Sequence, residues 1–100
     1  MKIWLDDERF PPNTIDWVWV TTAEKAKALL ETGLYDTVSL DHDLGPVEAG
    51  TGYDVASWLE CRAVEGKFIP ATILIHSANP VGRKNMEAAI KAIDKYRLPC

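Results

Sequence analysis

The chain has 100 residues, of which 47% are hydrophobic and 26% are charged, and its formal net charge is −4. This length fits a single domain over residues 1–100 with one modest core. No apolar run reaches the roughly 18–20 residues of a membrane helix, so we expect no membrane partner. The absence of a lysine or arginine cluster argues against a wide basic surface for nucleic acid, but a single nucleotide or a nucleic-acid end held through a metal fits the composition.

The two cysteines carry no metal or redox spacing. Cys61 falls inside a helical pattern and Cys100 is the last residue, so no C-x-x-C motif is present. We expect two free thiols in a reducing compartment, and therefore a cytoplasmic protein. The short apolar run at residues 3–5 is too brief for the core of a signal peptide.

The first half of the chain predicts two strands and one helix. Residues 2–5 form a short apolar strand, and the prolines within residues 10–13 exclude a helix there. Aromatic and β-branched side chains over residues 17–20 predict the second strand. Residues 21–24 fit a capping box, which begins a helix that Gly33 ends.

The second half predicts two more strands and two more helices. The strands cover residues 35–40 and 71–75, and the loop at residues 47–50 is polar. Between these strands, Thr51 caps a helix. Asn79 and the proline after it form a good first turn for the last helix.

Alternation of strands and helices predicts a mostly parallel sheet with right-handed crossovers. Only eleven residues separate Leu5 from Trp17, and they leave no room for a helix in the first connection. We therefore expect an α/β fold of four strands in the order 2-1-3-4 with three helices, in which the first crossover helix is missing. The two internal crossovers then place their helices on the same face.

The opposite face of the sheet is expected to be thinly covered unless the last helix folds back over it. Trp4 and one of the pair Trp17 and Trp19 are expected on that side. An exposed sheet face that carries tryptophan indicates a homodimer surface. The alternative interpretation is that the tryptophans fill a small core.

Acidic and polar residues follow three of the four predicted strands. These segments are Asp6-Asp7-Glu8, Asp41-His42-Asp43 and His76-Ser77-Ala78-Asn79. Ligands bind open parallel sheets outside the carboxyl ends of the strands, where the winding reverses, so we expect Asp6, Asp7 and Asp41 to converge. Because packed carboxylates repel each other, the cluster predicts a divalent metal, Mg²⁺ or Mn²⁺ above all, that shares its shell with a phosphate.

Both histidines sit at carboxyl ends of strands, and Asp41 and Asp43 flank His42. A carboxylate orients an imidazole and raises its pKa, so His42 and His76 could act as general base and general acid, with Asp43 orienting one of them. Two histidines and a carboxylate could also bind a softer metal. A purely structural role is the third interpretation.

Several polar side chains around the last predicted helix could bind a phosphate. Ser77 could donate a hydrogen bond to it or act as a nucleophile, and Asn79 could contact the ligand, cap its helix, or both. Backbone N–H groups at a helix start bind anions, and Arg83 and Lys84 would add positive charge there. A solvated first turn is the alternative for these two. Arg9 completes the predicted phosphate-binding set.

Four segments together resemble the cyclic-phosphate processing receiver-like domains. They are IWLDDER at residues 3–9, VSLDHDLG at 38–45, TGYD at 51–54, and IHSANP at 75–80 followed by Arg83, Asn85 and Met86. The resemblance spans nearly the whole chain. It implies a flavodoxin-like, receiver-like fold and an activity on cyclic phosphates such as RNA 2′,3′-cyclic ends or cyclic nucleotides.

The same family is similar to response-regulator receiver domains. In that comparison Asp6 and Asp7 match the acidic pair, Asp41 matches the phosphoacceptor and Ser77 matches the switch residue. The chain departs from a receiver because a proline loop follows the first strand, and we expect no fifth strand with a lysine within these 100 residues.

Three functions compete on these observations. The leading hypothesis is a metal-dependent phosphoesterase that acts on a cyclic phosphate. The alternatives are a receiver-type switch phosphorylated on Asp41 and a non-catalytic module that binds a nucleotide or a partner protein.

Overall fold

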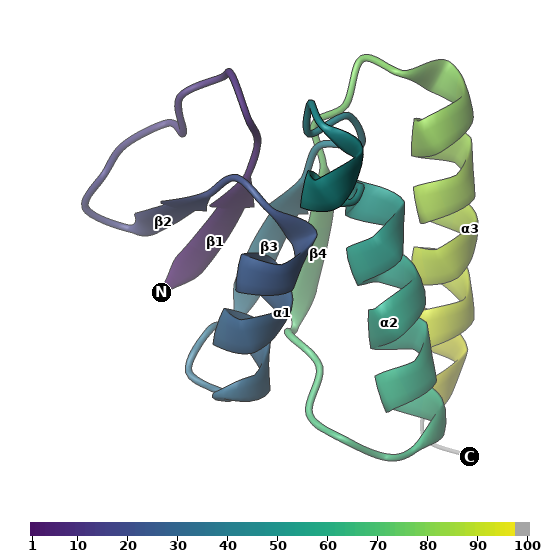
Figure 1. Cartoon of the computed structure of the whole chain (residues 1–100). Coiled ribbons are helices and arrows are strands. Elements are labelled where there is room, and N and C mark those ends of the chain that lie inside the picture. The colour runs from purple at the N-terminus through teal and green to yellow at the C-terminus, as the bar shows by residue number, and fades with distance from the viewer. Residues whose placement is uncertain (98–100) are drawn as a thin grey trace.

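A parallel four-stranded sheet forms the centre of the computed structural model, which describes residues 1–97 (Figure 1). The strand order is β2-β1-β3-β4, as predicted, and each neighbouring pair is parallel. The strands are β1 (Lys2–Leu5), β2 (Trp17–Val20), β3 (Thr37–Leu40) and β4 (Thr72–Ile75). The third and fourth strands begin one or two residues later than the sequence predicted.

Three helices follow the last three strands: α1 (Ala23–Glu31), α2 (Gly52–Val64) and α3 (Pro80–Arg97). No helix lies between β1 and β2, as predicted, and the loop before α2 contains one 3₁₀ turn, Val47–Ala49. The expected capping box at the start of α1 does not form. Thr22 is the cap there and accepts from the N–H of Lys25, which offers no carboxylate in return.

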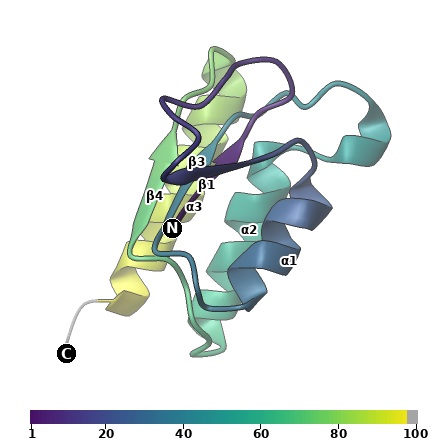
Figure 2. The same ribbon diagram turned by 90° about the vertical axis from the view of Figure 1, so that its left-hand side faces the viewer.

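The hydrophobic core lies between one face of the sheet and the helices. Ile3, Leu5, Val38 and Leu40 point to this face and are fully buried, because alternate residues of a strand face the same side. α1 and α2 cover this face, and α3 packs mainly on α2 and along β4 (Figure 2).

Among residues 1–97, no helix is both long enough and apolar enough to cross a membrane.

The other face of the sheet carries Trp4, Trp17 and Trp19, and no helix covers it within the described part of the chain. Trp19 is 37% exposed and Leu74 on β4 is 45% exposed. The expectation that only one of Trp17 and Trp19 faces this side was wrong. Both do, since Val18 and Val20 take the core side and side chains two apart share a face.

Cys61 is a free and exposed thiol on α2. The expectation for Cys100 lies outside the described residues.

Candidate functional site

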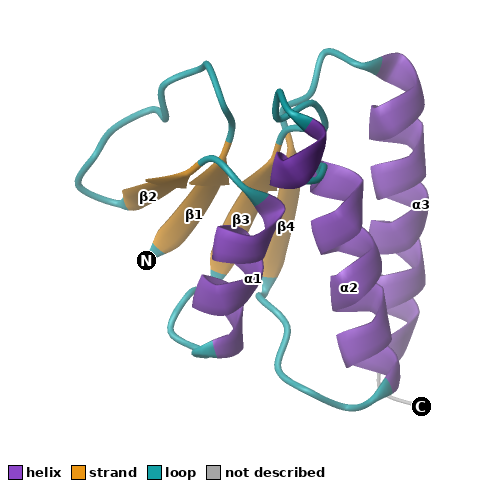
Figure 3. Ribbon diagram, viewed as in Figure 1, coloured by secondary structure: helices purple, strands orange, loops and turns teal. Residues whose placement is uncertain are grey.

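Three acidic side chains converge where β1 and β3 end. Carboxylate oxygens of Asp6, Asp7 and Asp41 all lie within 4.8 Å of one another. The loops after β1, β3 and β4 gather at the same end of the sheet (Figure 3), because parallel strands have their carboxyl ends at one edge. They enclose a pocket of about 330 Å³, which is lined by Asp6, Asp7, Glu8, Arg9, Asp41, Asp43, Gly45 and Ala78.

Asp6 is held rigidly although it is a fully buried carboxylate. Its Oδ1 accepts hydrogen bonds from the N–H groups of Glu8 and Arg9, both at 2.8 Å. Its Oδ2 lies 2.9 Å from Nε2 of His76. A buried carboxylate needs such partners, and they also fix the direction in which its remaining lone pairs point.

His76 is clamped on the helix-free face of the sheet. Its Nδ1 lies 2.6 Å from Oγ of Ser39, and its ring stacks on Trp4 with centroids 3.8 Å apart and planes 5° apart. Burial lowers the pKa of His76, and the hydrogen bond to Asp6 opposes this effect. An ionised carboxylate only accepts, so Nε2 donates to Asp6 and the Ser39 hydroxyl donates to Nδ1.

With both ring nitrogens engaged, His76 is placed to orient Asp6. The acid–base role that the sequence suggested for His76 stays a prediction. These contacts favour the structural interpretation, because a proton-transfer group needs a nitrogen that faces the ligand.

The pocket disfavours the ionised form of the Asp41 carboxyl group. Burial raises the pKa of Asp41, and the neighbouring charge of Asp6 raises it further. The Ser77 side chain and the N–H of His42, which lies 2.8 Å from Oδ1, act in the opposite direction as donors. A divalent cation between the carboxylates removes this repulsion, so the residues present fit an oxygen-bound Mg²⁺ or Mn²⁺.

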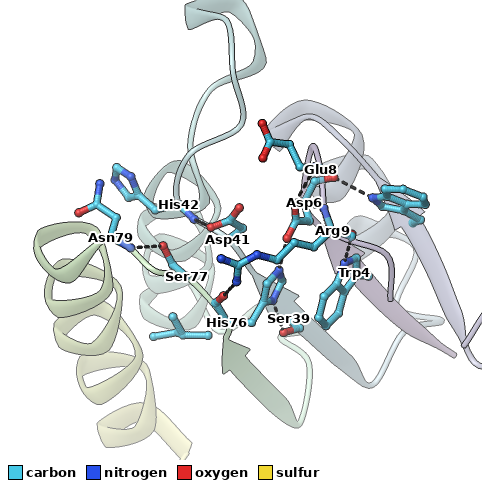
Figure 4. Close-up of polar contacts among 12 residues, drawn as sticks. Trp4, Asp6, Glu8, Arg9, Ser39, Asp41, His42, His76, Ser77 and Asn79 are labelled. Atoms are coloured by element: carbon cyan, nitrogen blue, oxygen red, sulfur yellow. Dashed lines mark hydrogen bonds and ion pairs between the residues drawn. The ribbon is translucent and has the colours of Figure 1, made fainter. Parts of the chain in front are cut away.

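His42 lies on the α3 side of the pocket, next to Asn79 (Figure 4). Its ring packs against Gly82, where an added Cβ would come within 2.3 Å of the ring carbon Cγ. Its Nδ1 lies 3.1 Å from Oδ1 of Asp43, which lines the pocket. Hydrogen bonds from His42 and Asn79 lower the pKa of Asp43, so this carboxyl is ionised at neutral pH.

Ser77 and Asn79 link the pocket to the start of α3. Ser77 is nearly buried beside Asp41, and its Oγ accepts the N–H of Asn79 at 3.1 Å. Asn79 caps the helix as predicted, since its Oδ1 accepts the N–H groups of Val81 and Gly82. Its Nδ2 donates to Asp43 at 3.2 Å, so the same side chain also fixes the pocket wall.

The predicted cations do not all reach the pocket. Arg9 lines it, and its guanidinium extends across to the carbonyl of His76 at 3.2 Å (Figure 4). Arg83 does not: it donates to the carbonyl of Ile75 and pairs with Glu87 at 3.1 Å in a separate groove between β4 and α3. Its position on the first turn of α3 directs the long side chain towards the edge of β4, and Lys84 is exposed on the same turn.

Sequence reasoning missed three residues that support the site. Ser39 anchors His76, Trp4 stacks on it, and the indole N–H of Trp19 donates to the main-chain carbonyl of Asp6 at 2.7 Å. Strand parity is the signal that could have found them. Trp4 and Ser39 are register partners on β1 and β3, and a serine amid apolar residues of a buried strand needs a polar partner.

We compared the chain with curated proteins, solved structures and models of protein families, and a family model agrees with this geometry. No curated protein and no solved structure matches the chain. The family model described as the cyclic-phosphate processing receiver domain matches residues 1–92, a stretch that contains every strand end of the pocket. The chain therefore belongs to the family of cyclic-phosphate processing receiver domains.

Proposed function

We propose that this domain is a metal-dependent phosphoesterase that opens a cyclic phosphate. The observation that carries the proposal is the convergence of Asp6, Asp7 and Asp41 within 4.8 Å in an open pocket. Such a group of carboxylates is costly unless a cation neutralises it, and Mg²⁺ shares its shell readily with phosphate oxygens. Membership of a family named for cyclic-phosphate processing supplies the substrate class.

Asp6, Asp7 and Asp41 would hold Mg²⁺ or Mn²⁺, which neutralises phosphate charge and lowers the pKa of bound water when present. Arg9 extends across the pocket and would bind a non-bridging phosphate oxygen through its guanidinium. Ser77 donates to Asp41 in this structure, and its hydroxyl would turn to donate a hydrogen bond to a second phosphate oxygen once a cation neutralises Asp41.

The His42 and Asp43 pair would move the protons. Water adds to phosphorus, one ester P–O bond breaks, and the leaving sugar oxygen takes a proton, so the product is a ring-opened monophosphate. His42 is the candidate proton-transfer group because its Nδ1 is bonded to Asp43, and Asp43 lines the pocket. His76 would act indirectly by holding Asp6.

The test is to incubate the protein with a 2′,3′-cyclic mononucleotide in the presence of Mg²⁺, Mn²⁺ or a chelator. Chromatography then detects the ring-opened monophosphate. Product should appear only with metal, Asp41→Asn should abolish it, and His42→Ala should lower turnover by about 10²–10⁴-fold. Asp36→Asn is the matched control, because Asp36 is exposed and precedes β3 where Asp41 follows it. Turnover that survives chelation or Asp41→Asn would contradict the proposal. Metal-dependent binding without product would favour a non-catalytic nucleotide-binding module.

Phosphorylation of Asp41 is the second candidate function. It is favoured by the placement of Asp41 beside Asp6, Asp7 and Ser77, the residues that match a receiver. No lysine is among the described residues that line the pocket, and Arg9 is the cation there. Incubation with acetyl phosphate and Mg²⁺ should then give an acid-stable, hydroxylamine-labile adduct that Asp41→Asn removes. Absence of the adduct would eliminate this candidate.

A further inference from the structure

Two edge-to-face pairs of aromatic rings lie on the helix-free face of the sheet, and we call them together the aromatic strip. The strip consists of Phe10, Trp19, Trp17 and Trp4. The Phe10 and Trp19 rings meet edge to face with centroids 5.0 Å apart, and Trp4 and Trp17 do so at 5.5 Å. Trp4 and Trp19 are register partners on neighbouring strands, so the two pairs adjoin. Phe10 is 79% exposed and Trp19 is 37% exposed, so this end of the strip is open to a ligand.

The strip is tied directly to the acidic pocket. The indole N–H of Trp19 donates to the carbonyl of Asp6, and that of Trp4 donates to the carbonyl of Arg9 at 2.9 Å. Asp6 and Arg9, the two residues that accept these hydrogen bonds, both line the pocket. His76 covers one face of the Trp4 ring, so the exposed rings of Phe10 and Trp19 are the part of the strip that a ligand can reach. Because the indole N–H of Trp19 is engaged, these rings favour a flat aromatic group over a polar one.

We propose that the aromatic strip binds the base of a mononucleotide whose cyclic phosphate occupies the acidic pocket. The inference rests on the proposed function and adds the substrate class: a nucleoside cyclic phosphate, not a cyclic phosphate without a base. A nucleotide carries an aromatic ring and a phosphate on one sugar, and the main-chain carbonyls of the pocket residues Asp6 and Arg9 accept the indole N–H groups of Trp19 and Trp4. Stacking of one base on aromatic side chains changes affinity by roughly 5- to 150-fold.

The charge pattern favours a free mononucleotide over a longer nucleic acid. RNA binding requires several cations that follow the phosphate chain. The chain has a net charge of −4, and the cations beside the strip are Arg9, which extends into the pocket, and Lys2, whose Nζ lies 5.3 Å from the Trp17 ring. Lys2 begins β1 and Arg9 follows its other end, so Arg9 alone lies at the pocket and the two cations do not form a track for several phosphates.

The experiment compares a 2′,3′-cyclic mononucleotide with ribose 2′,3′-cyclic phosphate, its base-free counterpart, by calorimetry in Mg²⁺. The titration uses His42→Ala, which is expected to hydrolyse the ligands too slowly to disturb the measurement. The nucleotide should bind at least about fivefold more tightly. In NMR spectra it should shift the indole N–H signals of Trp17 and Trp19, while Trp58 on α2 serves as an internal reference.

Phe10→Ala removes an exposed ring and should reduce the difference between the two ligands. Phe68→Ala is the matched control, because Phe68 is also exposed but lies in the loop between α2 and β4, at the opposite end of the sheet from the pocket. Equal affinity of both ligands, unchanged by Phe10→Ala, would overturn the base site and leave the proposed function standing. Failure of both ligands to bind would overturn the proposed function as well.

Two further outcomes would overturn the inference. One is self-association through the tryptophans that a nucleotide does not displace, which would assign this face to a homodimer. The other is much tighter binding of an RNA that ends in a cyclic phosphate than of the mononucleotide.

Discussion

Nε2 of His76 lies 2.9 Å from Oδ2 of Asp6, although 70 positions separate the two residues along the chain. The contact joins the end of β4 to the end of β1 across β3, whose Ser39 holds the other ring nitrogen. A histidine in this position stiffens a candidate metal ligand. His76 therefore positions Asp6, whereas His42 is the candidate proton-transfer group. The affinity for metal distinguishes these two roles.

His76→Ala should weaken Mn²⁺ binding by about 10- to 100-fold, the usual effect of losing a partner that orients a metal ligand. His42→Ala is the matched control and should leave Mn²⁺ affinity within about twofold, because the contact of His42 with Asp41 is made by its main-chain N–H. Calorimetric titration of both variants decides this. Equal losses in the two variants would contradict the division of roles.

At neutral pH His76 should be uncharged and protonated on Nε2. Burial lowers the pKa of His76 below its ordinary value of 6.5, so the folded state binds fewer protons than the unfolded state just below that pH. Stability should therefore fall as the pH is lowered through 6.5. Long-range ¹H–¹⁵N spectra of the ring report the tautomer directly. A charged ring at pH 7, or a proton on Nδ1 alone, would disagree with the contacts to Ser39 and Asp6.

Asp41→Asn should stabilise the metal-free protein while it abolishes metal binding. The pKa of Asp41 is raised above its ordinary value of 3.8, so the folded state loses stability as the pH rises through the interval between the unfolded and folded values. The charged form is thus a cost at neutral pH, and removing it should raise Tm by a few degrees, on the scale of ~4–8 °C per kcal/mol. Thermal melts at pH 7 and pH 3 measure this effect. A lower Tm for the variant at pH 7, or a difference that persists at pH 3, would refute this reasoning.

Gly82→Ala should displace the His42 ring without changing the metal ligands. The new Cβ would lie 2.3 Å from Cγ of His42, so the ring has to move. Alanine in place of a helical glycine otherwise stabilises a helix by about 1 kcal/mol. A loss of turnover in this variant would therefore not be explained by a less stable helix. We expect turnover to fall as in His42→Ala, with Mn²⁺ affinity retained. Asn85→Ala, an exposed position on the same helix, is the control. Wild-type turnover in Gly82→Ala would remove His42 from the mechanism.

The fold and the acidic centre were predictable because they depend on patterns that lie close together in the sequence. Short apolar runs separated by helical stretches set the strand order, and the proline loop after β1 excluded a first helix. Since β1 and β3 are neighbours, the residues that follow them had to meet, which brings Asp6 and Asp41 together.

The directions of individual side chains were not predictable. His76 follows β4 directly, and the sequence does not say whether its ring turns towards Asp41 or towards Ser39 on the uncovered face. The direction of the Arg83 side chain depends on how α3 crosses β4, and this crossing is set by the packing of α3 on α2. The role of the tryptophans needed the register of β1 and β2, which a short aromatic run alone does not give.

We propose that Asp6, Asp7 and Asp41 hold a divalent metal that contacts a phosphate, and this can be seen in an anomalous difference map from crystals grown with Mn²⁺ and inorganic phosphate. We expect one Mn²⁺ peak among these three carboxylates, with phosphate density beside it towards Arg9 and Ser77. A map with no peak there, or with Mn²⁺ bound only by His42 and Asp43, would contradict it.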